Sequence, residues 1–151
     1  MSAAAPVRRA TPADVPVLVE LMAEFYAESA MPLDRAAVGG VFRGLLADPA
    51  RGAVWLVLAD GAPAGYVVLT VGFSMEYGGL DAFVDDLFVR PAHRRRGLGR
   101  AALDTLVAEC RRRGVQALHL EVARDNQSAK ALYEGFGFRG NDRQLLTLRL
   151  P

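Results

Sequence analysis

The stretch LFVRPAHRRRGLGRAALDTLVAECRRRG, residues 87–114, decides how this chain folds. An apolar run ends at Val89 as a strand would, and residues 100–113 have the spacing of an amphipathic helix. The connection between them contains a proline, five basic side chains and two glycines, Gly97 and Gly99. Glycines let a backbone approach a ligand, loop amides can form a nest, and a helix N-terminus supplies about half a positive charge. The order of strand, basic loop and helix therefore predicts a pyrophosphate site.

Two other phosphate fingerprints do not fit this loop. A P-loop is excluded because the chain has no Gly-Lys-Ser/Thr. The dinucleotide pattern G-x-G-x-x-G is disfavoured, because Ala102 stands at the third glycine position and no acidic residue ends a strand about 20 positions on. Arginine runs are usually solvated surface, but the place of this run between a strand and a helix favours a binding loop.

The rest of the chain alternates strand and helix signals, which is typical of an α/β domain. Strands are expected at residues 7–10, 54–59, 64–71, 81–89, 117–123, 138–140 and 145–150. Helices are expected at residues 12–28, 34–46, 100–113 and 128–136, the first with Thr11 as its N-cap. Asp60-Gly61 signals a hairpin turn, and residues 73–79 are expected to form an excursion between two strands.

Two motifs resemble those of the GNAT superfamily of acyl-CoA-dependent N-acetyltransferases. The cofactor signature of that family, R/Q-x-x-G-x-G/A after a strand, is matched by Arg94, Gly97 and Gly99. Its last motif is an asparagine followed by A-x-x-L-Y-x-x-x-G-F, matched here by Asn126, Ala129, Leu132, Tyr133, Gly137 and Phe138. Together the motifs span residues 81–140, and the joint match is far more specific than either motif alone.

The resemblance implies one α/β domain over residues 1–151 with the GNAT fold. This fold has a mixed central sheet, here of six to seven strands splayed at strands 4 and 5, with about four helices. Acetyl-CoA is implied to lie in the gap, in contact with Leu87, Phe88, Val89, Arg94, Arg95, Arg96, Gly97, Leu98, Gly99, Arg100, Asn126 and Tyr133. Among these, Leu87 is implied to donate its main-chain N–H to the thioester carbonyl, at a bulge in the fourth strand.

Acyl transfer needs a neutral amine, yet a primary alkylamine has a pKa of about 10.4, so a base must take a proton. Asp85 is the first candidate, because strand alternation puts it on the same face as Leu87 and Val89 and polyamine-type family members carry an acid there. Glu121 is the second, because it matches the base of bacterial enzymes that acetylate ribosomal-protein N-termini. A water relay is the third. The resemblance implies that Tyr133 is the acid that protonates the departing thiolate.

The acceptor is expected to be a small amine, with a protein N-terminus or a lysine as the alternative. A histone-type mechanism is disfavoured because Phe83 stands where such members place a glutamate. A non-catalytic acyl-CoA sensor is a further alternative, but the retained tyrosine and acids favour an enzyme. Five acidic residues could line a mouth for a cationic amine or be solvated surface: Glu24, Glu28, Asp34, Glu76 and Asp81.

Composition favours a soluble globular enzyme, since 52% of the residues are hydrophobic. The 18 basic and 17 acidic residues give a formal net charge of +1, which argues against a nucleic-acid partner. Cys110 is the only cysteine, no apolar run approaches 18 residues, and residues 1–15 have no signal-peptide core. We therefore expect a cytoplasmic protein with no membrane partner. No metal is expected, because His119 has no companion ligand; a homodimer through the C-terminal strands is expected.

Overall fold

The structure, a computed structural model, describes residues 5–151. The expectation that residues 1–15 hold no signal-peptide core falls in part on residues 1–4, which lie outside the described residues. The chain forms two compact units, the first ending at Leu120 and the second spanning Glu121–Pro151. The single-domain expectation stays a prediction. No helix among the described residues is both long enough and apolar enough to cross a lipid bilayer.

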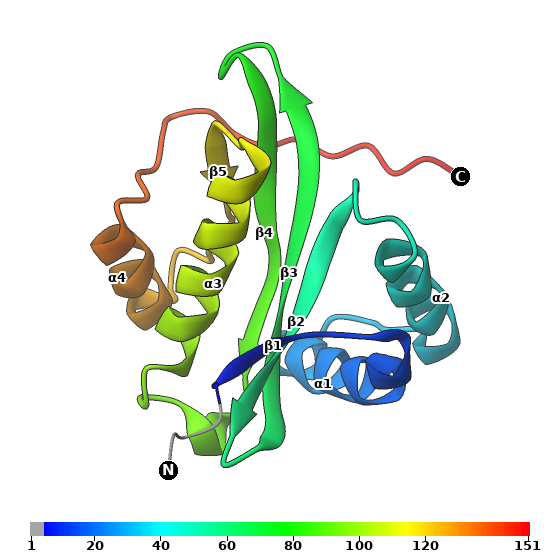
Figure 1. Cartoon of the computed structure of the whole chain (residues 1–151). Coiled ribbons are helices and arrows are strands. Elements are labelled where there is room, and N and C mark those ends of the chain that lie inside the picture. Colours follow the sequence, from blue (N-terminus) through cyan, green and yellow to red (C-terminus); the bar gives the residue numbers. More distant parts are fainter. Residues whose placement is uncertain (1–4) are drawn as a thin grey trace. The chain divides into compact units, whose positions relative to one another are not determined.

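The first unit is built on one sheet with the strand order β1-β2-β3-β4-β5 (Figure 1). Its strands are β1 (Val7–Arg9), β2 (Gly52–Ala59), β3 (Ala62–Ser74), β4 (Gly79–Val89) and β5 (Ala117–His119). Neighbours from β1 to β4 run antiparallel, whereas β5 runs parallel to β4. The sheet is therefore mixed, as expected.

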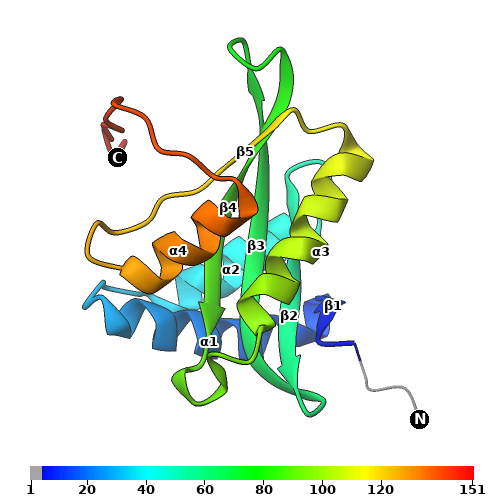
Figure 2. The same cartoon turned by 90° about the vertical axis from the view of Figure 1, so that its left-hand side faces the viewer.

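Helices cover both faces of this sheet. The first face carries α1 (Val15–Glu28) and α2 (Arg35–Leu46), and the opposite face carries α3 (Leu98–Arg113), as two views show (Figures 1 and 2). Two short 3-10 turns, η1 (Pro12–Asp14) and η2 (Pro91–His93), come before α1 and α3. The second unit contains α4 (Gln127–Phe136). The four expected helices are thus confirmed, each within about one turn of its expected bounds.

Local signals account for two of the connections. The Asp34 carboxylate caps α2, since it accepts hydrogen bonds from the N–H groups of Ala36 at 3.1 Å and Ala37 at 3.2 Å. Asp60 (φ +52°) and Gly61 (φ +80°) are both left-handed, as a two-residue hairpin turn between β2 and β3 requires. The expected excursion at residues 73–79 is the tip of the β3–β4 hairpin: residues 75–78 form the turn, and the ends of β3 and β4 supply the rest.

The core under α1 and α2 uses one side of each strand. Alternate residues of the sheet face these helices and are buried: Val54, Leu56, Tyr66, Val68 and Phe88. The Phe25 ring of α1 stacks on Phe88 with 5.3 Å between ring centroids. It also meets Tyr66 edge-on at 6.4 Å. Aromatic packing therefore fixes α1 against the C-terminal end of β4 and the part of β3 that pairs with it.

The C-terminal strands differ from the expectation. β5 ends at His119 instead of residue 123, and no strand is found at residues 138–140 or 145–150 within the described chain. Within residues 5–151 the sheet has five strands, so the expected six to seven are not confirmed. The leucine side chains in residues 145–150 are 66–83% exposed. Their alternating pattern therefore does not correspond to a strand with one buried face. The expected homodimer rested on these strands and stays a prediction.

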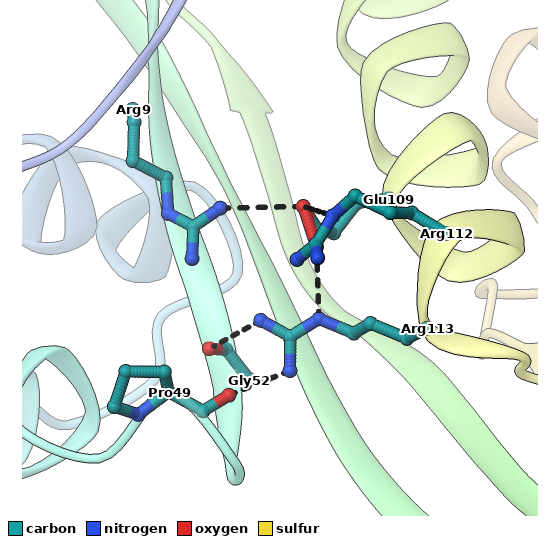
Figure 3. Close-up of polar contacts among 6 residues, drawn as sticks. All are labelled: Arg9, Pro49, Gly52, Glu109, Arg112 and Arg113. Carbon is teal, nitrogen blue, oxygen red and sulfur yellow. Dashed lines mark hydrogen bonds and ion pairs between the residues drawn. The ribbon is translucent and has the colours of Figure 1, made fainter.

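Glu109 on α3 is the centre of an ion cluster that ties this helix to the sheet (Figure 3). Its carboxylate accepts hydrogen bonds from three arginines: Arg9 of β1, Arg112 and Arg113. Arg113 also donates to the carbonyls of Pro49, at 2.6 Å, and Gly52, at 3.2 Å. The Glu109 side chain is only 11% exposed. Hydrogen bonds from Arg112 and then Arg113 hold the pKa of Glu109 down at about 2.

The Glu109→Gln variant tests this cluster. We expect it to lower the free energy of unfolding at pH 7 by about 2 kcal/mol, because hydrogen bonds to a charged group are lost. The folded-state pKa of Glu109 lies below its ordinary value of 4.5, so the stabilisation is present above pH 4.5 and is lost as the pH falls toward 2. Urea unfolding at pH 7 and pH 3 measures both effects.

The matched control for that measurement is Glu20→Gln. Glu20 pairs with Arg35 on the surface, where both side chains are more than half exposed. Its loss should change stability by less than about 0.5 kcal/mol. Equal losses in the two variants would contradict the role assigned to Glu109.

Candidate active site

The loop between β4 and α3 presents backbone amides at the start of a long helix. Arg95 (φ +63°) and Gly97 (φ +77°) are both left-handed, and such residues turn neighbouring N–H groups toward one side as an anion nest. Gly97 is also the N-cap of α3 and supplies no side-chain hydrogen bond to it. The side chains of Arg95 and Arg96 are exposed beside these amides. The residues present therefore fit the predicted pyrophosphate.

Two other arginines of the loop tie it to α1. The Arg90 guanidinium donates to the Glu24 carboxylate at 2.9 Å. One turn later on α1, Glu28 accepts from Arg94 at 2.7 Å, and Arg94 also donates to the carbonyl of Val89 at 2.7 Å. The predicted contact of Arg94 with a cofactor stays a prediction. In this structure its guanidinium fixes the loop to the end of β4 and to α1.

One edge of β4 is open next to this loop. β5 pairs with β4 only over Asp81–Phe83, and no other strand in residues 5–151 pairs with that side of β4. The N–H of Arg90 donates to the carbonyl of Ala64 on β3 at 2.7 Å. Because donors alternate along an antiparallel ladder, the N–H groups of Leu87 and Val89 point away from β3, toward the open edge. Leu87 therefore presents the main-chain donor that was predicted for a carbonyl oxygen.

A bulge interrupts β4 just before this open segment. The register with β3 shifts between the pairs Leu69–Val84 and Val68–Asp86, so Asp85 is the extra residue. The predicted position of the bulge, Leu87, is wrong by two residues, because Leu87 pairs regularly with β3.

A cavity of about 800 Å³ is lined by α2, β3 and the bulge. Its apolar lining includes Met22, Val38, Phe42, Leu45, Val68 and Val71. Asp85 and Asp86 both line it, together with Asp48, Arg51 and Thr70. The cavity therefore has a mainly apolar lining and one acidic wall, which together suit a small ligand.

The cavity also corrects the predicted direction of Asp85. Strand alternation was expected to place Asp85 on the face of Leu87 and Val89. Leu87 pairs with Val67, which alternates with the core residues under α1 and α2, so it faces α3. Asp85 instead lines the α2 cavity beside Asp86, because the extra residue of a bulge breaks the alternation.

Asp86 is the more strongly perturbed of the two carboxyls. Burial raises its pKa to about 6; a hydrogen bond from the Tyr66 hydroxyl, at 2.8 Å, opposes the rise, and the charge of Asp85 adds to it. Burial also raises the pKa of Asp85. The pKa of Tyr26 on α1 is raised by burial and then by Asp86 and Asp85, so both carboxylates act on it. A carboxyl that titrates near pH 6 in a cavity is suited to general-base work.

Sequence reasoning missed Asp86 and Tyr66 as functional residues. The available signal was the pair of adjacent aspartates in DAFVDDLFV, which breaks the alternation of an otherwise regular strand. Such a break indicates a bulge. The hydroxyl of Tyr66 gave no signal, because its partner lies 20 residues away in sequence.

In the second unit, Asn126 and Tyr133 lie at the two ends of α4. The Asn126 side chain caps the helix by accepting from the N–H of Ala129 at 3.2 Å. Gly137 (φ +104°) ends the helix, and the N–H of Phe138 bonds to the Tyr133 carbonyl at 3.1 Å. The Phe138 ring meets Tyr133 edge-on at 6.0 Å, and burial raises the pKa of Tyr133. The G-F end of the motif thus positions the tyrosine ring.

Several acidic residues have structural partners. Glu24 and Glu28 pair with the loop arginines, and Asp34 caps α2. Asp81 lies 3.0 Å from His119. These contacts favour the structural interpretation of these four over an acidic mouth.

Other candidates have simpler roles or stay untested. Cys110 is buried on α3 and packs in the core. Glu121 follows β5 at the start of the second unit, and its role as a base stays a prediction. Within the described residues, no group of three or more His, Cys, Asp or Glu side chains could hold a metal ion.

Comparison with known proteins agrees with this geometry. The acetyltransferase (GNAT) family model matches residues 16–138. The [ribosomal protein bS18]-alanine N-acetyltransferase of Escherichia coli K12 is 47% identical over 58 residues, which cover 38% of this chain and 39% of that enzyme. The matched part is thus well under half of the enzyme's length.

Two solved structures have the same fold. An integron cassette protein from the mobile metagenome of Cole Harbour Salt Marsh is 46% identical, with a TM-score of 0.87 over 97% of this chain and 91% of that one. A predicted acetyltransferase from Clostridium acetobutylicum, solved with acetyl-CoA, is 17% identical, with a TM-score of 0.80 over 94% of each chain. At that identity the second likeness concerns the fold alone.

The Tyr66→Phe variant tests the electrostatics of the bulge. Removal of the hydroxyl takes away the hydrogen bond that lowers the pKa of Asp86, so this pKa should rise above about 6. Asp85→Asn should move it the other way, because a like charge is lost. NMR titration of isotope-labelled aspartate carboxyls measures both shifts, and unchanged values in both variants would contradict the assigned contacts.

Proposed function

The chain belongs to the acetyltransferase (GNAT) family, and on this premise we propose that it transfers an acetyl group from acetyl-CoA to a primary amine. The observation that carries the proposal is the open edge of β4, which runs from the bulge at Asp85 to the loop before α3. An extended amide-bearing ligand can add to such an edge as a strand would. A pyrophosphate at the end of that ligand then meets the N-terminus of α3.

Residues of the loop and of β4 bind different parts of acetyl-CoA. The amides around Gly97, with the side chains of Arg95 and Arg96, bind the pyrophosphate. The outward N–H groups of Leu87 and Val89 pair with the pantetheine arm and the acetyl carbonyl. Acetyl-CoA itself supplies an acetyl group activated as a thioester. The Leu87 N–H lies where negative charge develops on the carbonyl oxygen, and a preoriented donor there lowers the barrier.

Two proton transfers complete the proposed reaction. A base takes a proton from the acceptor ammonium; Asp85, Glu121 and a water relay are the candidates from the sequence. Tyr133 gives a proton to the departing thiolate. Burial raises the pKa of Tyr133, so its hydroxyl stays protonated near neutral pH, as a proton donor must be.

A small amine is the acceptor that we propose. The α2 cavity supports it, because its volume of about 800 Å³ and its acidic wall suit a compact cation. A second candidate is a protein α-amine, which is favoured by the name of the E. coli relative. Because that match covers 39% of the relative, its substrate comes to this chain only as a candidate. A screen that pairs small amines with alanine-initiated peptides separates the two.

The Gly99→Asp variant tests the cofactor site. It places a carboxylate in the first turn of α3, where it repels a pyrophosphate. Wild-type protein should bind acetyl-CoA with a micromolar Kd, and the variant should bind at least about 100-fold more weakly, as measured by calorimetry. The control is Gly40→Asp in α2, where an added Cβ meets nothing within 4 Å. Wild-type protein that does not bind acetyl-CoA would contradict the proposed function.

The Tyr133→Phe variant tests the proposed acid. We expect kcat to fall by about 100-fold while the Kd for acetyl-CoA stays within about twofold, because the ring is kept and only the proton donor is lost. Wild-type kcat in this variant would remove Tyr133 from the mechanism. Tight binding of acetyl-CoA by the wild-type chain without turnover on any amine would favour the sensor alternative.

A further inference from the structure

The two adjacent aspartates of β4 are not equivalent, although the bulge turns both toward the α2 cavity. Asp85 is exposed and makes no hydrogen bond through its side chain among those found in the described structure. Asp86 is half-buried and held by the hydroxyl of Tyr66, which is itself fully buried. One carboxylate is therefore held by a hydrogen bond, and the other is more open to solvent, although partial burial raises its pKa.

Asp86 also lies next to the open edge of β4. The residue after it, Leu87, directs its N–H to that edge, while the Asp86 side chain lines the cavity on the α1–α2 side. The Asp86 carboxyl and the Leu87 N–H thus come from adjacent residues of β4, about 3.3 Å apart along the strand, which brings a nucleophile in the cavity close to a carbonyl bound at that N–H. This is the proximity that attack on the carbonyl requires.

On this geometry, and resting on the proposed function, we propose that Asp86 is the base that deprotonates the acceptor, and that the α2 cavity receives the body of an apolar primary amine. Asp85 then contributes negative charge at the cavity wall without taking the proton. The assignment differs from the sequence-based choice of Asp85, because that choice assumed regular alternation up to a bulge at Leu87, whereas the bulge lies at Asp85 itself.

The proton and electron balance is simple. The acceptor R–NH₃⁺ gives one proton to the Asp86 carboxylate, and the freed lone pair of its nitrogen forms the new C–N bond. The C–S bond breaks, and its electron pair leaves on sulfur as a thiolate. Tyr133, the acid proposed above, gives its proton to the thiolate, and the second proton of the nitrogen replaces the proton that Tyr133 has lost. Asp86 then loses its proton to solvent, so that one proton is released for each amide formed.

The groups around Asp86 set the pH range of this step. Tyr66 of β3 donates to it, Asp85 of β4 repels it, and Tyr26 of α1 lies within the field of both carboxylates. Asp48 and Arg51, at the ends of the connection between α2 and β2, face the same cavity with opposite charges. Since the pKa of Asp86 is about 6, the carboxylate is present above that pH while an alkylamine is still protonated. Activity should therefore rise as the pH increases through about 6.

The lining of the cavity indicates the class of acceptor. Beyond the acidic wall most of its surface is made by apolar side chains such as Val38, Phe42 and Leu45, which gain from contact with hydrocarbon. The further carboxylate in the lining, Asp48, is already paired with Arg51 at 2.8 Å. A monoamine with an apolar body fits this lining better than a polyamine. Phenethylamine is a suitable probe, with spermidine and an alanine-initiated tripeptide as comparisons.

The Asp86→Asn variant is the central test. Asparagine can still accept the hydrogen bond from Tyr66, so the fold should be kept, but it cannot take a proton. We expect kcat/KM for phenethylamine to fall by about 100-fold and the rise near pH 6 to disappear. The matched variant Asp85→Asn should lose less than about tenfold and move the rise to lower pH. An equal or larger loss in Asp85→Asn would overturn the assignment of Asp86.

A binding measurement without acetyl-CoA gives an independent readout. Phenethylamine should shift the carboxyl NMR signal of Asp86 in wild-type protein, and spermidine and the tripeptide should do so at about tenfold higher concentration or not at all. An Asp86 signal that phenethylamine does not move would overturn the cavity assignment. The wild-type protein could show this shift and bind acetyl-CoA and yet acetylate no amine. That result would contradict the proposed acetyl transfer and the base role of Asp86, and it would leave the amine site in place. Full turnover by Asp86→Asn would contradict the base role alone.

Discussion

The bulge at Asp85 is the constraint on which the site depends. A regular strand would send Asp85 and Asp86 to opposite faces, and only one carboxyl could reach the α2 cavity. The extra residue turns both toward the cavity and leaves Leu87 in register with β3. The same strand thus offers an acidic wall on one face and an outward N–H at its edge. Moving the bulge by one residue would separate these features, so its position matters more than the identity of the apolar side chains around it.

The loop before α3 and the α2 cavity are linked through α1. Arg90 and Arg94 hold Glu24 and Glu28, which lie one turn apart on that helix. Pairs this exposed contribute about 0–1 kcal/mol each, so they orient the elements more than they stabilise them. Met22, which lines the cavity, lies two residues before Glu24 on the same helix. The position of the phosphate loop and one wall of the cavity are therefore set by the same helix.

The sequence predicted those features that depend on neighbouring residues. The basic glycine loop and the hairpin at Asp60-Gly61 follow from local chemistry, and the structure has them. Thr11, expected as the N-cap of the first helix, instead precedes the 3-10 turn η1, and Asp14 is the N-cap of α1. The end of β5 and the lack of strands after residue 137 depend on partners elsewhere in the chain, which periodicity does not reveal. The predicted direction of the Asp85 side chain is wrong for a related reason, because side chains alternate between the two faces of a strand only while its register with the neighbouring strand is regular. The role of Asp86 could not be predicted from the sequence, because it depends on Tyr66, which is close to Asp86 only in the folded chain.

The raised pKa of Asp86 connects the stability of the fold to the ligand that we propose. The folded protein binds the proton of Asp86 more tightly than an unfolded chain does, so the free energy of unfolding falls as the pH rises from about 4 through 6. Above that range the fold holds a charged carboxylate that burial disfavours, with a second carboxylate beside it. A cationic amine in the cavity offsets both costs, whereas a neutral ligand of the same shape offsets neither. The electrostatic cost of the empty site is therefore itself a reason for the site to prefer a protonated amine, and deprotonation by Asp86 begins from that pair.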